Sequence, residues 1–380
     1  MKNVLMLASV ASMIDQFNMT NIELLQKLGY NVDVGCNFVN GNTCSDKQIL
    51  DLKNRLGERN IKYYQVDFTR NIMDFKQNIV AYRQVLNLVQ KNKYEFIHCH
   101  SPIGGVIGRL VGYQEKTKVI YTAHGFHFYK GAPKKNWLIY YPIEKFLSKL
   151  TDCLITINKE DYQLAKKKFS MKHLVYCPGV GVESGKHEID NQKIKKLREK
   201  YADENEIVFL SVGELNRNKN HLNVIQALSQ LDIPYKYIIC GKGNLQSRIE
   251  NIVKKNNIQD RVFLAGFCTN IDEYLAMADV FCFPSYREGL SVSLMEAMVY
   301  GLPVVCSRIR GNVDLVDRKG GIFFEPDNVE SIKEAIIGIV DKKELWKQMG
   351  IYNQQKMKEF DCKKVTQIMK QVYSELQEEK

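Results

Sequence analysis

Residues 284–298 read Pro-Ser-Tyr-Arg-Glu-Gly-Leu-Ser-Val-Ser-Leu-Met-Glu-Ala-Met and are flanked on both sides by short apolar segments. Ser291 is a favourable N-cap, apolar side chains recur after it at helical spacing, and Gly301 supplies a stop. The flanking segments are apolar, short and bounded by polar residues, as buried strands are. The stretch therefore predicts a strand, a loop, a helix over residues 291–300 and a second strand.

Two carboxylates stand out in this stretch, because Glu288 precedes the predicted helix and Glu296 lies inside it, with seven residues between them. A helix N-terminus offers free backbone N–H groups to a phosphate, and Gly289 lets a ligand approach the backbone closely. We predict a sugar-nucleotide pocket in which Glu296 accepts hydrogen bonds from ribose hydroxyls, Glu288 contacts the transferred sugar, and the loop backbone from Gly289 through Leu290 to Ser291 binds the donor. The alternative is that both carboxylates are solvated surface charges.

The order of strand, Pro-Ser, Glu-Gly and apolar helix resembles the retaining glycosyltransferases of family 4, whose donor domain carries a Glu-x7-Glu motif in this setting. The resemblance extends to bacterial capsular and exopolysaccharide enzymes. It implies an α/β protein of the GT-B fold, in which two Rossmann-like, doubly wound parallel-sheet domains face a cleft.

The chain's 380 residues, 45% of them hydrophobic, suffice for two hydrophobic cores. A Pro-Gly segment at residues 177–182 suggests a crossing between domains. We expect an N-terminal acceptor domain over residues 1–182 and a C-terminal donor domain over residues 183–358. The resemblance implies that residues 359–380 form a helix that returns to the first domain.

Apolar runs alternate with helix-like stretches throughout the N-terminal half, which favours a parallel sheet covered by helices. Strands are predicted at residues 4–8, 32–36, 62–66, 96–100, 119–122 and 153–157. Helices are predicted at residues 17–28, 72–90 and 105–112, and residues 9–13 are interpreted as the first loop. Further helices are expected at residues 192–201, 222–231, 331–345 and 357–376. Ligands of such sheets bind at the carboxyl ends of the strands.

Histidines follow two of these predicted strands. His98-Cys99-His100 suggests a metal site, but neighbouring strand residues point to opposite faces and no further ligand lies at a recognised spacing, so we expect no metal. His124 and His127 belong to a His-Gly-Phe-His segment that is similar to one in capsular family 4 enzymes. The resemblance places His124 against the donor sugar, although a structural histidine is the alternative. Acceptor contacts are expected from Ser12, His100 and His127.

A second apolar strand, residues 207–213, ends in glycine and leads into a loop with two cations, Arg217 and Lys219. A strand, a cationic loop and a helix suit phosphate binding. The resemblance implies that this loop supplies an Arg and a Lys to the donor diphosphate. Lys219 matches the lysine, whereas Glu214 stands where the family often has its arginine, so Arg217 is the expected substitute. The resemblance also places Gly266 and Phe267 beside the nucleobase.

The net charge of +11 calls for an anionic partner such as nucleic acid or a membrane surface. Residues 130–172 hold ten lysines and four acids. The lysines include Lys134, Lys135, Lys145 and Lys149, and they are interleaved with Trp137, Tyr140, Tyr141 and Phe146. Cations mixed with aromatic rings suit the interface of an anionic bilayer. The alternative is a solvated face over an ordinary core.

The ten cysteines show no Cys-x-x-Cys spacing, and several lie inside apolar strand-like runs, which favours buried thiols in a reducing cytosol. No apolar run approaches the roughly 20 residues that span a bilayer. We therefore expect a cytoplasmic protein that associates peripherally with the inner face of the plasma membrane.

The resulting hypothesis is a retaining glycosyltransferase with His124, Glu288 and Lys219 as its catalytic residues. It would transfer a sugar from a nucleoside diphosphate sugar to a polyprenyl-diphosphate-linked saccharide in capsule or exopolysaccharide synthesis, and the family favours UDP as the nucleotide. The chain contains no Asp-x-Asp, so we expect cations and the helix dipole, rather than a metal cofactor, to stabilise the leaving diphosphate. Two alternatives are a GT-B sugar-nucleotide epimerase and a basic nucleic-acid-binding protein, although no nucleic-acid-reading motif is present.

Overall fold

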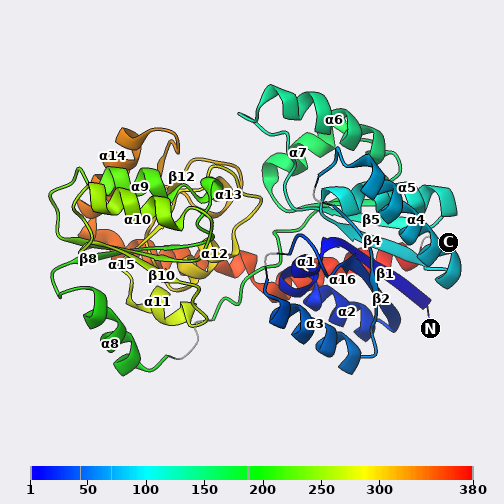
Figure 1. Ribbon diagram of the computed structural model, residues 1–380, viewed down its shortest axis with the longest axis horizontal. Coiled ribbons are helices and arrows are strands. Elements are labelled where there is room, and N and C mark those ends of the chain that lie inside the picture. The colour runs from blue at the N-terminus through cyan, green and yellow to red at the C-terminus, as the bar shows by residue number, and fades with distance from the viewer. Residues whose placement is uncertain (1, 43, 70, 186–188, 379–380) are drawn as a thin grey trace. The chain divides into compact units, whose positions relative to one another are not determined.

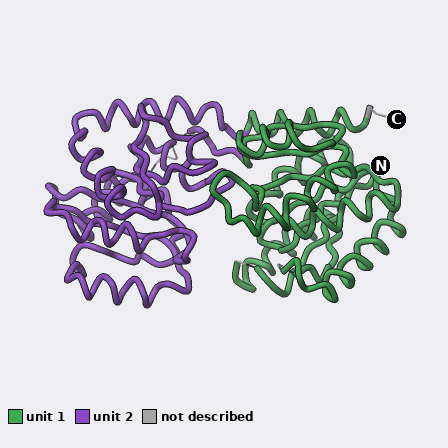
Figure 2. The backbone as a smooth tube through the Cα atoms, turned by 90° about the horizontal axis from the view of Figure 1, so that it is seen from above, with its two compact units in different colours: residues 1–180, 363–380 green, residues 181–362 purple. Residues whose placement is uncertain are grey.

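The computed structural model describes residues 2–42, 44–69, 71–185 and 189–378. The chain divides into two compact units, residues 1–180 with 363–380 and residues 181–362 (Figure 2). The boundaries expected from the sequence, after residues 182 and 358, lie within a few residues of these. Each unit contains one entirely parallel sheet with helices on both faces (Figure 1).

Unit 1 holds a seven-stranded sheet in the order β3-β2-β1-β4-β5-β6-β7. Its strands are β1 (Lys2–Val10), β2 (Tyr30–Asn37), β3 (Lys62–Gln65), β4 (Phe96–His100), β5 (Lys118–Ala123), β6 (Cys153–Thr156) and β7 (His173–Tyr176). Its helices are α1 (Ala11–Phe17), α2 (Met19–Lys27), α3 (Asp46–Glu58), α4 (Phe75–Asn92), α5 (Pro102–Glu115), α6 (Lys134–Ser148), α7 (Lys159–Lys168) and α16 (Cys362–Glu378).

Unit 2 holds a six-stranded sheet in the order β10-β9-β8-β11-β12-β13. Its strands are β8 (Ile207–Val212), β9 (Tyr235–Cys240), β10 (Val262–Gly266), β11 (Val280–Phe283), β12 (Val304–Ser307) and β13 (Gly321–Phe324). Its helices are α8 (Asn191–Tyr201), α9 (His221–Leu228), α10 (Gln246–Lys255), α11 (Ile271–Met277), α12 (Val292–Val299), α13 (Asn312–Leu315), α14 (Val329–Val340) and α15 (Trp346–Met357), with short 3-10 turns η1 (Arg217–Lys219), η2 (Lys343–Leu345) and η3 (Lys358–Phe360).

The expected doubly wound parallel sheets are confirmed, and the apolar runs that predicted their central strands are buried between helices on both faces, whereas the edge strand β3 is largely exposed. In each unit the strand order reverses beside the first strand, between β1 and β4 and between β8 and β11. The carboxyl ends of the strands at such a switch point are the usual ligand sites of these sheets.

One sequence interpretation is wrong at the end of the first strand. Residues 9–13 do not form a loop, since β1 runs to Val10 and α1 begins at Ala11. The helix expected over residues 17–28 is present as α2, which begins at Met19 and is separated from α1 by the fully buried Asn18. Asn18 donates a side-chain hydrogen bond to the Met13 carbonyl at 3.0 Å, so its amide stabilises the break between α1 and α2. Ser12 therefore lies in a helix.

The helices near the C-terminus also differ from expectation. Residues 346–357 form α15, which the sequence did not indicate, and the last helix begins at Cys362 rather than at residue 357. α16 packs into the core of unit 1 through Val365, Met369, Val372, Tyr373 and Leu376. Lys118 Nζ also donates to the Leu376 carbonyl at 2.7 Å, so α16 is bound to β5.

All ten cysteines are free thiols, as the sequence predicts. No helix in the described part of the chain is long and apolar enough to cross a bilayer.

Candidate active site

In unit 2, the loop that follows β8 positions Lys219. The side chain of Asn216 accepts a hydrogen bond from the Lys219 backbone N–H at 3.0 Å and thereby caps the short turn η1. A Cβ on Gly213 would approach Lys219 Cδ and Cε to 3.2 Å, so glycine leaves room for the lysine stem. The loop thus directs the Lys219 side chain across the carboxyl end of β8.

Lys219 meets Glu288, which lies in the loop between β11 and α12. Lys219 Nζ is 2.7 Å from Glu288 Oε1, and the two side chains are only 20% and 16% exposed. Lys219 Nζ also lies 5.0 Å from the centre of the Phe283 ring at the end of β11. The structure therefore brings together two of the three predicted catalytic residues at the switch point between β8 and β11, where a partly desolvated cation can attract phosphate.

The loop that carries Glu288 is supported by a residue that the sequence analysis missed. The buried Arg310 donates from Nε to the Glu288 carbonyl at 3.2 Å. Gly311 has φ +82°, and a Cβ there would come within 2.4 Å of the Gly289 carbonyl oxygen. In the sequence, Arg310 is recognisable only as a cation directly before Gly311, and that pattern does not indicate a contact with Glu288.

The predicted helix after this loop is present as α12. Ser291 is its N-cap and accepts a hydrogen bond from the Leu294 N–H at 3.3 Å. Ser293 Oγ donates to the Val212 carbonyl at 3.4 Å, which joins the first turn of α12 to the end of β8. Glu296 lies further along α12 and is half-buried. Glu288 and Glu296 thus occupy the loop and helix positions that the sequence predicts.

Arg217 lies apart from this pair. Its side chain is exposed and borders a surface pocket of about 370 Å³ together with Arg248, Tyr286 and Asn223. Neither Lys219 nor Glu288 belongs to the described lining of that pocket. The structure thus groups the expected second cation with Arg248, whereas Arg310 contacts the Glu288 loop.

The predicted nucleobase segment lies at the end of β10. Gly266 has φ +74°, a conformation that favours glycine, and its carbonyl accepts a hydrogen bond from the Gly241 N–H at 2.7 Å. The Phe267 side chain is 64% exposed, so its ring is available for stacking.

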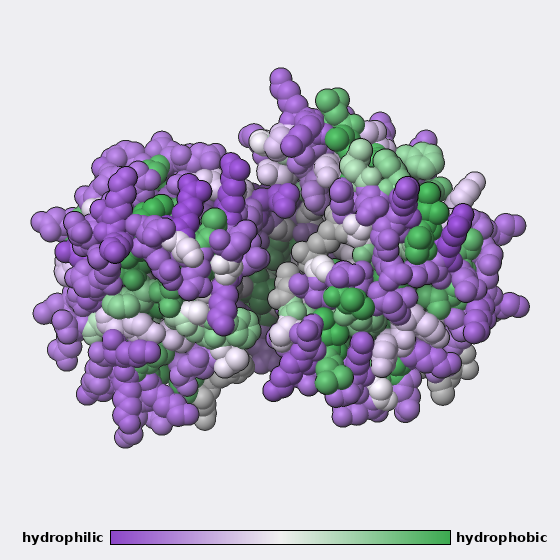
Figure 3. Space-filling view, viewed as in Figure 1, coloured by the Kyte–Doolittle hydropathy of each residue, from purple (hydrophilic) through white to green (hydrophobic). Residues whose placement is uncertain are grey.

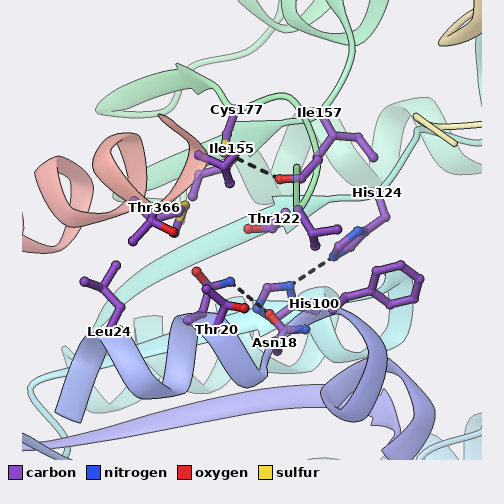
Figure 4. Close-up of a pocket in the computed structure, with 16 residues that line it drawn as sticks. Asn18, Thr20, Leu24, His100, Thr122, His124, Ile155, Ile157, Cys177 and Thr366 are labelled. Carbon is purple, nitrogen blue, oxygen red and sulfur yellow. Dashed lines mark hydrogen bonds between the residues drawn. The ribbon is translucent and has the colours of Figure 1, made fainter. Parts of the chain in front are cut away.

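In unit 1, His98 and His100 lie in β4 and His124 follows the end of β5; Figure 4 shows the contact between His100 and His124. His98 bonds Tyr373 Oη through Nδ1 and Thr122 Oγ1 through Nε2, both at 2.9 Å. His100 Nδ1 lies 3.1 Å from His124 Nε2, so one ring donates to the other. Cys99 points to the opposite face and donates to the Ile120 carbonyl. Within the described residues, no group of three or more His, Cys, Asp or Glu side chains could hold a metal ion.

His100 and His124 line one pocket with residues from α1, α2, the ends of β5 and β6, and α16 (Figure 4). Its polar side chains include Asn18, Thr20 and Thr366. Ser12 and His127 are not part of this described lining. Ser12 is buried in α1, and the His127 ring stacks on Tyr140 at a centroid distance of 4.7 Å. Of the residues expected to bind the acceptor, the pocket therefore contains only His100, next to His124.

Burial keeps these histidines uncharged. It lowers the pKa of His98 to about 3 and that of His124 to about 4, and it holds the pKa of His100 well below its usual range. At neutral pH, His124 is therefore a hydrogen-bonding group rather than a cation.

We expect unit 1 to lose stability as the pH falls from about 6.5, the usual histidine pKa, toward 4. In this range the unfolded chain takes up protons that the buried histidines exclude, so the free energy of unfolding decreases with falling pH. The measurement is urea unfolding at several pH values, followed by Trp137 fluorescence in a Trp346→Phe background. His98→Gln should flatten the dependence, and an unchanged slope in that variant would contradict the assignment.

Family models match both units of the chain. The model described as glycosyl transferases group 1 matches residues 192–356, and the model described as glycosyl transferase 4-like matches residues 3–158. The putative glycosyltransferase EpsD of Bacillus subtilis strain 168 is 31% identical, over 98% of this chain and 96% of the relative. The chain belongs to the family 4 glycosyltransferases.

Other relatives agree with this glycosyltransferase assignment. The Escherichia coli UDP-Gal:alpha-D-GlcNAc-diphosphoundecaprenol alpha-1,3-galactosyltransferase is 32% identical, over 72% of each chain. The structure of Anabaena Alr3699/HepE in complex with UDP matches with a TM-score of 0.79 and 17% identity, over 99% of this glycosyltransferase and 100% of that chain. The structural likeness shows the GT-B fold, and the expected enzyme class is confirmed.

Proposed function

We propose that this glycosyltransferase transfers a sugar, with retention of anomeric configuration, from a nucleoside diphosphate sugar to a saccharide carried on polyprenyl diphosphate. The observation that carries the proposal is the half-buried pair of Lys219 and Glu288 beside the start of α12. The nucleotide is UDP and the product belongs to a capsular polysaccharide or exopolysaccharide. In support, the Escherichia coli relative is named for a UDP-Gal donor and a diphosphoundecaprenol acceptor, and a Campylobacter jejuni relative, 30% identical over 41% of this chain, is named for a diphospho-undecaprenol acceptor.

The donor-binding roles in this proposal follow from the chemistry of each group. Lys219 neutralises the departing diphosphate, and Glu288 orients the sugar while it holds the lysine in place. Glu296 accepts hydrogen bonds from the ribose. The loop backbone from Gly289 through Leu290 to Ser291 approaches the phosphates, and the end of β10, with Gly266 and Phe267, contacts the base.

A second cation at the diphosphate comes from Arg217 or Arg310. Arg217 is the substitute for the family arginine that the sequence led us to expect, but it borders a different pocket. Arg310, which follows β12, is buried against the Glu288 carbonyl and so contacts the loop that forms the donor site. The contact with Glu288 favours Arg310.

The remaining proposed roles, that of His124 toward the donor sugar and those of the acceptor-binding residues, belong to unit 1. His124, uncharged at neutral pH, hydrogen-bonds a sugar hydroxyl and orients the reacting carbon. His100 fixes the His124 ring through their 3.1 Å contact and lines the pocket that receives part of the acceptor. Ser12 and His127 are not part of the described lining of that pocket. In this proposal they contact saccharide units of the acceptor that lie further from the reacting carbon.

The proposed reaction breaks the bond between the anomeric carbon and the diphosphate oxygen, and an acceptor hydroxyl forms the new bond on the same face. The departing phosphate oxygen takes the proton of that hydroxyl, so no protein nucleophile is required. Positioned cations and backbone N–H groups stabilise the leaving charge without a metal ion. Because the acceptor is lipid-linked, the enzyme works peripherally at the cytoplasmic face of a membrane.

Incubation with UDP-, GDP- and ADP-sugars, with and without a polyprenyl-diphosphate-linked acceptor, tests the proposal. Product analysis should show one added sugar on the lipid and release of nucleoside diphosphate only when acceptor is present. Conversion of the sugar nucleotide without acceptor would indicate an epimerase instead, and consumption of none of the donors would contradict both.

Glu296→Ala is expected to weaken UDP binding by about ten- to a hundredfold, because a hydrogen bond to a charged group is lost. Isothermal titration with UDP measures the change. Glu330→Ala, which removes an exposed carboxylate from α14, is the matched control and should leave the affinity unchanged. Unaltered UDP affinity in Glu296→Ala would show that the ribose assignment is wrong.

A further inference from the structure

The outward face of α6 combines exposed apolar and basic side chains. Leu138 is 77% exposed, Ile139 43% and Phe146 58%, so this helix presents three large apolar side chains to solvent. Between and beside them lie exposed lysines, namely Lys134, Lys135, Lys145 and Lys149. Figure 3 shows apolar surface among hydrophilic side chains in the region where Figure 1 places α6. We call this set of seven residues the α6 face.

The aromatic rings that first suggested a membrane surface mostly point the other way. Trp137, Tyr140 and Tyr141 pack against the core that lies between α4, α5 and the first sheet. Trp137 Nε1 donates to the Tyr129 carbonyl at 3.2 Å. Of the four rings in the sequence pattern, only Phe146 belongs to the α6 face, and its apolar surface comes mainly from Leu138 and Ile139.

No acidic side chain offsets the lysines on this helix. Glu144, the only acid in α6, is buried and pairs with Arg109 at 2.7 Å. The neighbouring helix α7 adds exposed Lys167 and Lys168, which border a groove with Trp137 and Tyr141 from α6. The exposed charged side chains on α6 and at this groove are therefore all lysines.

We infer that the α6 face docks on an anionic lipid bilayer, with Leu138, Ile139 and Phe146 among the acyl chains and the lysines at the headgroup phosphates. A helix face of this kind binds such interfaces because apolar side chains are buried among the acyl chains and lysines are attracted to anionic headgroups. A second copy of this chain fits less well, because a twofold contact would set lysine against lysine. The inference deepens the proposed function, since a lipid-linked acceptor lies in a bilayer.

Another exposed apolar group on unit 1 lacks this charge pattern. Met73, 61% exposed, and Phe75, 64% exposed, stand on either side of Asp74. Phe75→Ser is therefore a matched control for Phe146→Ser, because it removes a similarly exposed ring from a site where an acid, Asp74, lies beside a single exposed lysine, Lys76. The matched control for the lysine reversal is α8, which has four exposed lysines and no exposed large apolar side chain. These lysines are Lys193, Lys195, Lys196 and Lys200.

The experiment is co-sedimentation of the full chain with vesicles of phosphatidylglycerol and phosphatidylcholine, compared with phosphatidylcholine alone. Wild type should bind the anionic vesicles more than about tenfold better, and added salt should weaken the binding. Reversal of the four α6-face lysines to glutamate should abolish binding, and Leu138→Ser with Phe146→Ser should reduce it at least about tenfold. Reversal of the four α8 lysines and Phe75→Ser should each have little effect.

Unchanged binding after the α6 substitutions, or equal binding of wild type to both vesicle types, would overturn the inference. So would concentration-dependent dimerisation that the same substitutions remove. Transfer to a short-chain, water-soluble acceptor separates this result from the proposed function: the α6 variants should keep that activity while they lose vesicle binding. Vesicle binding without transfer from any donor would refute the proposed function and leave the docking surface supported. If the protein with the four reversed lysines does not fold, the protein with Leu138→Ser and Phe146→Ser still tests whether the α6 face binds vesicles.

Discussion

Lys219→Ala is expected to lower kcat/KM for the sugar donor by about two to three orders of magnitude, the usual effect of removing one preorganised donor to a developing negative charge. The ammonium is held by Glu288 and is only one-fifth exposed, so water replaces it poorly. The substitution also leaves the Glu288 carboxylate without its cation, which weakens the binding of a negatively charged donor further. Steady-state kinetics with saturating acceptor measure the effect.

Lys195→Ala removes an exposed lysine from α8 and serves as the matched control, with no change in kcat/KM expected. Parallel Arg217→Ala and Arg310→Ala variants identify the second cation, and the contact of Arg310 with the Glu288 carbonyl predicts the larger loss for Arg310. A Lys219→Ala enzyme with near wild-type kcat/KM would remove Lys219 from the diphosphate site.

Arg109→Ala is expected to destabilise unit 1 by about 3–5 kcal/mol, because it leaves the buried Glu144 carboxylate unpaired. Arg109 is 1% exposed and donates to Glu144 at 2.7 Å and to the Gly105 carbonyl at 2.8 Å. Its guanidinium carbon also lies 4.1 Å from the centre of the Tyr121 ring. The measurement is urea unfolding followed by Trp137 fluorescence in the Trp346→Phe background.

The exposed pair of Arg59 and Glu23, also 2.7 Å apart, provides the contrast. Arg59→Ala should cost less than about 1 kcal/mol, since water screens both charges. The double variant Arg109→Met with Glu144→Leu should recover much of the stability, because it leaves no buried charge without a partner. An equal decrease in the free energy of unfolding for Arg109→Ala and Arg59→Ala would show that the buried pair does not stabilise unit 1 more than an exposed pair does.

The sequence was informative where local chemistry determines structure. Residues 96–100 were predicted as a strand and are β4, because a short apolar run in a parallel sheet is buried on both faces. The helix after Ser291 was predicted from its N-cap, and the serine side chain makes that capping bond. Both predictions depended on residues that lie close together in the chain.

The sequence did not predict features that depend on contacts between distant residues, on an unmarked boundary between elements, or on the direction in which a side chain points. Arg310 meets the Glu288 carbonyl from 22 residues further along the chain, which no local pattern indicates. The α1 helix was missed because no glycine or proline separates it from β1, so residues 9–13 offered no boundary signal. In α6, Trp137, Tyr141 and Glu144 recur at helical spacing and lie on the inner face of the helix. The membrane prediction used only the composition of residues 130–172, and composition does not indicate which face of a helix a side chain occupies.

The configuration of the new glycosidic bond tests the central claim, retaining sugar transfer without a metal, most directly. The enzyme is incubated with an α-linked sugar nucleotide and acceptor in the presence of EDTA, and NMR gives the coupling constant of the product's anomeric proton. The predicted result is an α-linked product formed at the same rate with and without EDTA. A β-linked product, or loss of transfer in EDTA that a divalent cation restores, would contradict the claim.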